Sequence, residues 1–228
     1  MPIRVVLQRG PKAKKFVAFA VDWPGWSRGA KTPDAALETL AAYRDRYRPV
    51  AVRADVGREF DDSGPFDLAE DQVGAGSTDF WGISFAPSSF EQDPIDAAEL
   101  ERKITLLQAC WAYFDDVAAR VSPEMRKGPR GGGRDRDTII AHTIRVESED
   151  FARKVGLVVP ERGALAAGAL APDRSAYLEA MRAYQRGEFK RPMRSWTLAF
   201  LVRHSGFHAM DHAWEMEDKD LTDGTGHH

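Results

Sequence analysis

The first third of the chain alternates short runs of Val, Ile and Phe with turn-forming residues, a pattern typical of β-strands. The first two runs flank the segment RGPKAK, which suits a hairpin connection, and the turn sequence DWPGW follows them. The expected strands cover residues 3–8, 15–22, 50–57, 66–71 and 80–85.

One helical segment, residues 32–47, interrupts these strands. Thr32 is the expected N-cap, and Pro33 suits the first helical position. Pro49 is expected to end the helix, because proline lacks a backbone N–H. The expected buried stripe consists of Leu37, Leu40 and either Ala41 or Tyr43. The N-terminal part is therefore predicted to be a small ββαβ unit.

From residue 96 the apolar positions recur every three or four residues, which indicates amphipathic helices. The segment SSFEQDP before this change is the expected linker. The expected helices cover residues 96–121, 137–155, 173–187 and 195–219. In the second of them, Ile140, Ile144, Phe151 and Val155 form the expected buried stripe. The predicted fold class is α+β, with a ββαβ domain at 1–95 and an all-α four-helix bundle at 96–228.

Composition and charge limit which binding partners and which cellular compartment are expected for this chain. The 228 residues suffice for one large domain or two small ones, and the net charge of −3 gives no general attraction to nucleic acid or to an anionic membrane. No apolar run approaches the ~20 residues of a membrane span. Cys110 is the single cysteine, which excludes an intrachain disulfide and fits the reducing cytoplasm. Its apolar surroundings favour a buried structural role over a catalytic thiol.

Histidines are the strongest candidates for site chemistry. His204, His208 and His212 recur every four residues, so neighbouring imidazoles lie on one side of a helix. The outer two are about 12 Å apart along the axis, so one adjacent pair can share an ion and a third ligand must come from elsewhere. His142, beside Ile139, is the other internal histidine. Three histidines from two helices would leave an open position, as in catalytic zinc sites. The alternatives are a buried core histidine and a polar helix face.

Acidic side chains near these histidines have several candidate roles. Asp211 and Glu215 could accept hydrogen bonds from imidazole N–H groups, or could simply solvate the helix end. Glu147 falls near the centre of an apolar helix face, where an unpaired carboxylate is costly. It could orient a histidine, act as a ligand, or bond Arg145 or Arg203.

A glycine-rich basic loop, RKGPRGGGRDR, precedes the second of these helices. Arg130, Arg134 and Arg136 are candidates for binding an anion or an anionic cofactor there, because a helix N-terminus follows. The loop lacks the G-K-[ST] ending of a P-loop. The simpler interpretation is a flexible loop above the mouth of the bundle.

Residues 96–221 resemble the DinB/YfiT-like family of metal-dependent four-helix bundles. The resemblance rests on the segments GPRGGGRDRDTIIAH and FHAMDHAWEMED, and on the order of one histidine followed by a distant pair. It implies His142, His208 and His212 as ligands of a zinc or nickel ion, with His204 in a supporting position. It also implies a low-molecular-weight thiol such as mycothiol or bacillithiol, activated by the metal for transfer or isomerisation; hydrolysis is the related chemistry.

A second resemblance covers the segment FVAFAVDWPGWSRGAKTPDAALETLAAYRDRY, which is similar to the HicB-like antitoxin fold. Trp23 and Trp26 stand where that fold usually has an aliphatic and a small residue. They could line a ligand pocket or partner surface, or pack between domains. The resemblance implies the fold, whereas toxin neutralisation is not expected, because a helical bundle stands where such antitoxins have a DNA-binding segment.

Together these features predict a cytoplasmic, metal-dependent enzyme that acts on a small molecule as a thiol-dependent transferase, an isomerase or a hydrolase. The alternative is a non-catalytic binding or regulatory module with a HicB-like interaction domain and a structural metal. An RNA- or toxin-binding regulator is a further alternative, although the net charge of −3 disfavours nucleic acid as the partner. A homodimer is compatible with a bundle. His227 and His228 are set aside, because they could be the remnant of a tag.

Overall fold

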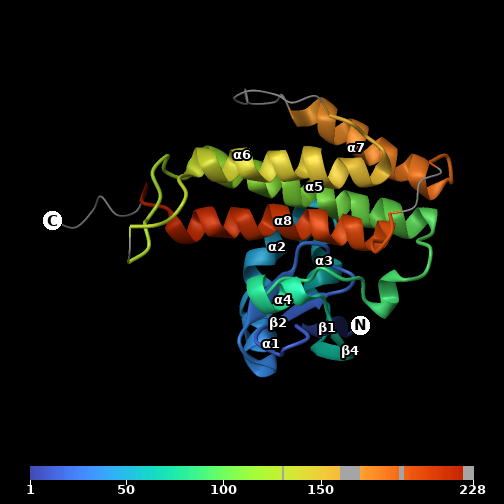
Figure 1. Cartoon of the computed structure of the whole chain (residues 1–228), viewed down its shortest axis with the longest axis horizontal. Coiled ribbons are helices and arrows are strands. Elements are labelled where there is room, and N and C mark those ends of the chain that lie inside the picture. The colour runs from blue at the N-terminus through green and yellow to red at the C-terminus, as the bar shows by residue number, and fades with distance from the viewer. Residues whose placement is uncertain (130, 160–169, 190–192, 223–228) are drawn as a thin grey trace. The chain divides into compact units, whose positions relative to one another are not determined.

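The protein has a mixed α+β fold, with a four-stranded sheet near the N-terminus and its longest helices in the C-terminal part (Figure 1). The computed structural model describes residues 1–129, 131–159, 170–189 and 193–222. Within these ranges there are eight α-helices. The chain forms two compact units, one of Met1–Ala109 with Pro192–Phe207 and one of Cys110–Arg191 with His208–His228.

The sheet has the strand order β3-β2-β1-β4. Its strands are β1 (Ile3–Arg9), β2 (Phe16–Ala20), β3 (Ser27–Ala30) and β4 (Phe66–Val73). Strands β1, β2 and β3 pair antiparallel, whereas β4 runs parallel to β1. The strands expected at 3–8, 15–22 and 66–71 are confirmed. Strand β3 was not expected, because its sequence SRGA lacks the apolar alternation that marks a strand.

Four short helices belong to the same unit as the sheet. They are α1 (Pro33–Ala42), α2 (Arg44–Arg53), α3 (Gly57–Asp61) and α4 (Gly76–Trp81). The expected start of α1 is confirmed, because the Thr32 hydroxyl accepts a hydrogen bond from the Ala35 amide at 3.2 Å and Pro33 follows it. Helix α1 packs against β1, β2 and β3 through Ala36 and Leu40, whereas Ala41 is exposed.

The strand expected at residues 50–57 is wrong, and Pro49 does not end the helical segment. Pro49 lies inside α2, which continues to Arg53. The valines of this segment favour a strand, but the buried positions 47, 50, 51 and 54 have helical spacing. Burial of this face therefore outweighs both the β-propensity and the missing backbone hydrogen bond of the proline.

The strand expected at residues 80–85 is also wrong. Its first two residues, Phe80 and Trp81, end α4 and are largely exposed. Gly82 follows with φ 71°, the left-handed conformation that commonly ends a helix and that glycine adopts without strain. The aromatic residues suggested a strand, while the glycine that ends α4 was the better signal.

An aromatic cluster fills the core of this unit. Trp23 and Trp26 are 4% and 1% exposed, and both pack against Tyr47 and Phe60. The Trp26 indole donates to the Leu40 carbonyl at 2.9 Å, so its polar group is satisfied inside the core. Neither tryptophan offers an exposed partner surface.

The four longer helices are α5 (Ala97–Arg120), α6 (Arg136–Val146), α7 (Leu170–Gln185) and α8 (Leu198–Lys219). In α5 the apolar positions with the expected spacing of three and four are buried, namely Leu100, Ile104, Leu107, Trp111 and Phe114, while Ala118 is half-buried. Helix α8 ends at Lys219 as expected but begins at Leu198 and not at residue 195, and the Thr197 hydroxyl before it accepts from the Phe200 amide at 3.2 Å. No helix in the described part of the chain is long and apolar enough to cross a membrane.

The second long helix differs from the expectation. Instead of one helix over 137–155, α6 ends at Val146 and is followed by a π-helical turn (Glu147–Phe151) and a 3₁₀ turn (Ala152–Val155). Phe151 and Val155 are buried as expected, but within α6 the buried positions are Ile139 and Thr143. The π turn adds a residue to the helical repeat. A single regular spacing therefore could not predict the buried positions both before and after the turn.

Candidate metal centre

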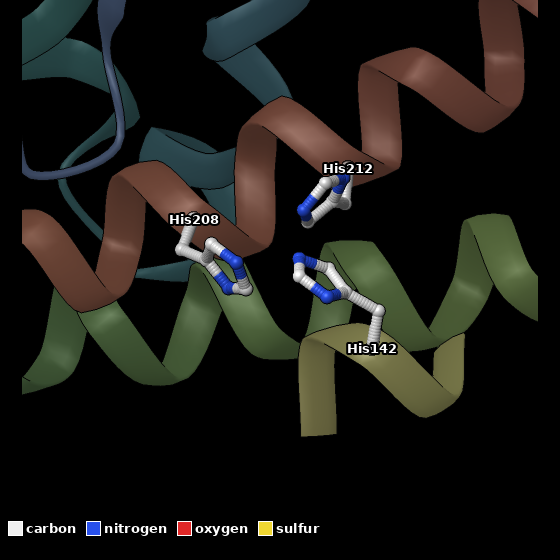
Figure 2. Close-up of side chains that lie close together, drawn as sticks. All are labelled: His142, His208 and His212. Atoms are coloured by element: carbon white, nitrogen blue, oxygen red, sulfur yellow. The ribbon is translucent and has the colours of Figure 1, made fainter. Parts of the chain in front are cut away.

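The candidate site is formed by α6 and the C-terminal half of α8, both within the second compact unit. His208 and His212 lie one turn apart on α8, and His142 comes from α6. Figure 2 shows the three imidazole rings turned toward one another, with a ring nitrogen of His212 facing one of His142. The ring centroids are 5.4 Å apart for His142–His208, 5.0 Å for His142–His212 and 4.6 Å for His208–His212.

The three histidines lie close enough to hold a metal ion. One nitrogen of each lies within 4.8 Å of the others. Tetrahedral coordination at 2.0–2.1 Å would bring such nitrogens to about 3.3 Å from one another, so small side-chain rotations suffice to close the site. His212 is 7% exposed, whereas His142 and His208 are half-buried and reachable from solvent. The donor set fits zinc or nickel, since both bind neutral imidazole.

Glu215 is placed to orient His212. Its Oε2 lies 2.8 Å from His212 Nδ1. A carboxylate accepts hydrogen bonds, so Nδ1 has to carry the proton, which leaves the lone pair of Nε2 for an ion. The contact from Arg134 to His212 Nδ1, at 3.4 Å, then cannot be a hydrogen bond. Glu215 therefore fixes the tautomer that metal binding requires.

Two cations hold Glu215 in place. Arg134 Nη2 donates to Oε2 and Lys219 Nζ donates to Oε1, each at 2.6 Å. Burial alone would raise the pKa of Glu215, but the hydrogen bonds from His212 and Lys219 and the charge of Arg134 lower it to about 2. Glu215 is therefore ionised across the physiological range. The spacing of Glu215 and Lys219 along α8 was a readable signal for this pair that sequence reasoning did not use.

The environment of His142 favours its neutral form. Burial lowers its pKa, and the nearby charges of His212, Arg134 and Arg145 lower it further. Only a neutral imidazole can donate a lone pair to a metal. The Phe151 ring lies 5.5 Å from the ring of His208 and covers it with an apolar edge. The cluster therefore combines a histidine whose neutral form is favoured, His142, with an aromatic neighbour of His208.

His204 belongs to the other compact unit and lies among aromatic rings. It is 4% exposed, and its ring centroid lies between 5.1 and 5.7 Å from those of Phe85, Trp196, Phe200 and Phe207. Burial, assisted by the charge of Arg203, lowers its pKa to about 3. His204 is thus a neutral core histidine.

Glu147 has a different partner from those expected. Its Oε1 accepts from Arg174 Nε at 3.2 Å, and the same arginine donates from Nη1 to Asp115 at 2.7 Å. The expected partners bond elsewhere, Arg145 to Glu149 and Arg203 to Glu91. Burial raises the pKa of Glu147 in spite of the Arg174 charge. Arg174 carried no signal in the sequence, since it lies in a different helix.

The loop arginines separate into different roles. Arg134 reaches the site, as described above. Arg136 turns away from it and donates to Asp137 at 2.9 Å and to the Val121 carbonyl at 3.3 Å. Arg130 lies outside the described residues. Asp211 is half-buried on α8, and its role as an acceptor stays a prediction.

Cys110 is fully buried, and burial raises the pKa of its thiol. The expected structural role is thus supported, because a buried thiol stays protonated and a protonated thiol is a poor nucleophile.

Comparison with protein-family models, with curated proteins and with solved structures gave no match for this chain. Both family resemblances therefore remain proposals, and function has to be inferred from the chemistry of the site.

Proposed function

We propose that this protein is a divalent-metal-dependent enzyme that acts on a small molecule. The observation that carries the proposal is the convergence of one nitrogen from each of His142, His208 and His212 within 4.8 Å. In the DinB-like interpretation, α5 to α8 form the four-helix bundle that holds the ion, and residues 1–95 form a HicB-like domain. That division follows the resemblance and differs from the two compact units, which both include parts of α5 and α8.

The number and exposure of the ligands favour catalysis over a structural metal. Structural zinc sites usually have four protein ligands and are closed, whereas catalytic sites have three and keep an open position. The cluster among the described residues has three members, and two of them, His142 and His208, are half-buried. A small molecule could therefore approach the site from solvent.

A zinc or nickel ion bound there would lower the pKa of a thiol or a water molecule and so supply a nucleophile at neutral pH. The residues of the chain have supporting roles. Glu215 keeps the proton of His212 on Nδ1, at 2.8 Å, and Phe151 shields His208 on one side. We favour transfer or isomerisation that depends on a low-molecular-weight thiol, or hydrolysis by a metal-activated water, in the cytoplasm.

The first test is elemental analysis of protein purified without a histidine tag, together with His142→Ala and His208→Ala. We expect about one zinc or nickel ion per chain in the wild type and loss of the ion in both variants. His204→Gln is the matched control, because it changes a histidine of the same helix that faces aromatic rings. No ion in the purified wild type, and no uptake of added zinc or nickel, would contradict the proposal.

X-ray absorption of the loaded protein separates an enzyme from a binding module. Three nitrogen ligands plus an exchangeable one support the enzyme. Four protein ligands would support the non-catalytic alternative, in which the metal only stabilises the fold.

A further inference from the structure

Arg134 has an incompletely used guanidinium beside the histidine cluster. Its Nη2 donates to Glu215 at 2.6 Å and lies 3.4 Å from His212 Nδ1. Among the residues that the structure describes, its Nε and Nη1 make no hydrogen bond. The side chain is 35% exposed, so these donors can be reached from solvent. A guanidinium presents its donors in a planar fork that matches a carboxylate.

The loop geometry sets this arginine in place. Gly133, the residue before Arg134, has φ 142°, a conformation that favours glycine. Asp135, the residue after it, accepts a hydrogen bond from the Met125 amide at 3.2 Å. Arg134 therefore lies between a glycine in a conformation that other residues rarely adopt and an aspartate whose carboxylate is bonded to the Met125 amide.

The charges around the cluster favour an anionic ligand. Glu215 is in contact with two cations, Arg134 and Lys219, so these three groups leave a surplus of one positive charge. Three neutral imidazoles would not neutralise a divalent ion, so binding of the ion would increase the surplus.

We propose that Arg134 binds a carboxylate of the small molecule that occupies the histidine site, which makes the substrate class a small organic acid. This inference rests on the metal centre proposed above. The carboxylate would accept a charge-assisted hydrogen bond from one of the free donors, Nε or Nη1, while Nη2 stays on Glu215.

The test uses the full chain loaded with Co²⁺, whose visible absorption reports changes in its ligands. The protein is titrated with β-mercaptopropionate and with its neutral amide, which differ only in the carboxylate. We expect the acid to bind about tenfold more tightly than the amide, as a charge-assisted hydrogen bond would give. In Arg134→Gln that preference should fall to about twofold or less.

Two controls separate direct contact from general electrostatics. Lys219→Gln removes one positive charge that, like the charge of Arg134, pairs with Glu215. Arg136→Gln removes an arginine of the same loop that bonds Asp137 instead. Both should keep most of the preference for the acid. An equal loss in Lys219→Gln and Arg134→Gln would overturn the proposal, because the preference would then come from the overall field.

The outcomes also separate this inference from the proposed function. If the wild type takes up Co²⁺ but binds acid and amide equally, the metal centre stands and the role of Arg134 is refuted. If the wild type takes up no Co²⁺ or zinc, both proposals fail together.

Discussion

At the scale of single residues, the chain shows how environment decides the role of a histidine. His204 and His208 are one turn apart on the same helix, yet the first packs among aromatic rings and the second faces two other imidazoles. The sequence pattern alone treats them alike, because both have a histidine four residues away. What distinguishes them is the partner that faces each one, and helix spacing contains no information about partners.

The buried position of His204 predicts a pH dependence of stability. Its pKa is about 3 in the folded protein, against roughly 6.5 in an unfolded chain. Below pH ~6.5 the unfolded chain therefore binds a proton that the folded protein does not, and stability falls by about 1.4 kcal/mol per pH unit. Urea unfolding at several values between pH 6 and 5 measures this slope. His204→Gln should have a shallower slope, and an unchanged slope would show that His204 is protonated in the folded state.

Glu215 is predicted to affect metal affinity without binding the metal. Glu215→Gln should weaken zinc binding by about 10–100-fold, because the amide no longer holds the His212 proton on Nδ1 with a charged acceptor. Competition with a chromophoric chelator gives the affinity. Glu217→Gln is the matched control, since Glu217 lies on the same helix but bonds Tyr113, at 2.7 Å. Equal affinities of Glu215→Gln and the wild type would show that the tautomer is fixed in another way.

At the scale of elements, regular periodicity predicted the helices reliably, whereas local interruptions of a helix could not be predicted. The stripe of α5 and the cap of α1 could be read directly, because each depends on neighbours along the chain. The π turn at Glu147–Phe151 could not, and its first residue, Glu147, has its partner Arg174 in another helix, α7. Residues 50–53 were misread because the burial of Val50 and Ala51 within the unit, and not the β-propensity of the segment, decides its structure.

A buried ion pair joins the first half of α8 to the 3₁₀ turn Ser89–Glu91. Glu91 accepts two hydrogen bonds from Arg203, at 2.6 and 3.1 Å, and both residues are 2% exposed. The Ser88 amide donates to the same carboxylate at 2.8 Å. Burial would raise the pKa of Glu91, but Arg203 and Ser88 lower it. The carboxylate therefore stays charged in the folded protein and satisfies the buried guanidinium.

Glu91→Gln should be strongly destabilising, by about 3–5 kcal/mol, because the charge of Arg203 would remain buried without its counter-ion. Chemical denaturation measures the loss. The exposed pair of Arg48 and Asp61 is the control, and Asp61→Asn should change stability far less. Because the folded pKa of Glu91 is lowered, its contribution is present above the unfolded value of about 4.5 and is lost as the pH falls below it. A small effect at neutral pH would mean that water enters and solvates Arg203.

At the scale of the whole molecule, the sequence predicted the histidine cluster better than its surroundings. His142, His208 and His212 could be selected only with the family resemblance, because the histidine spacing left open which adjacent pair of α8 is used. Arg174 could not, because its contacts to Glu147 and Asp115 connect three separate segments. The same limit applies to the compact units, each of which combines segments far apart in the chain.

Metal binding is predicted to stabilise the unit that contains the histidine cluster. Zinc binds the folded site and not the separated segments of an unfolded chain, so at a free concentration of 100 times its Kd it should add about 2.7 kcal/mol. That corresponds to a rise in Tm of roughly 5–10 °C. Calorimetry with and without zinc, with EDTA to reverse the effect, measures it. If the two units unfold separately, only the transition of the unit that holds the cluster should move, and the other serves as an internal reference. His142→Ala should abolish the shift, and a shift of equal size in that variant would place the zinc elsewhere on the protein.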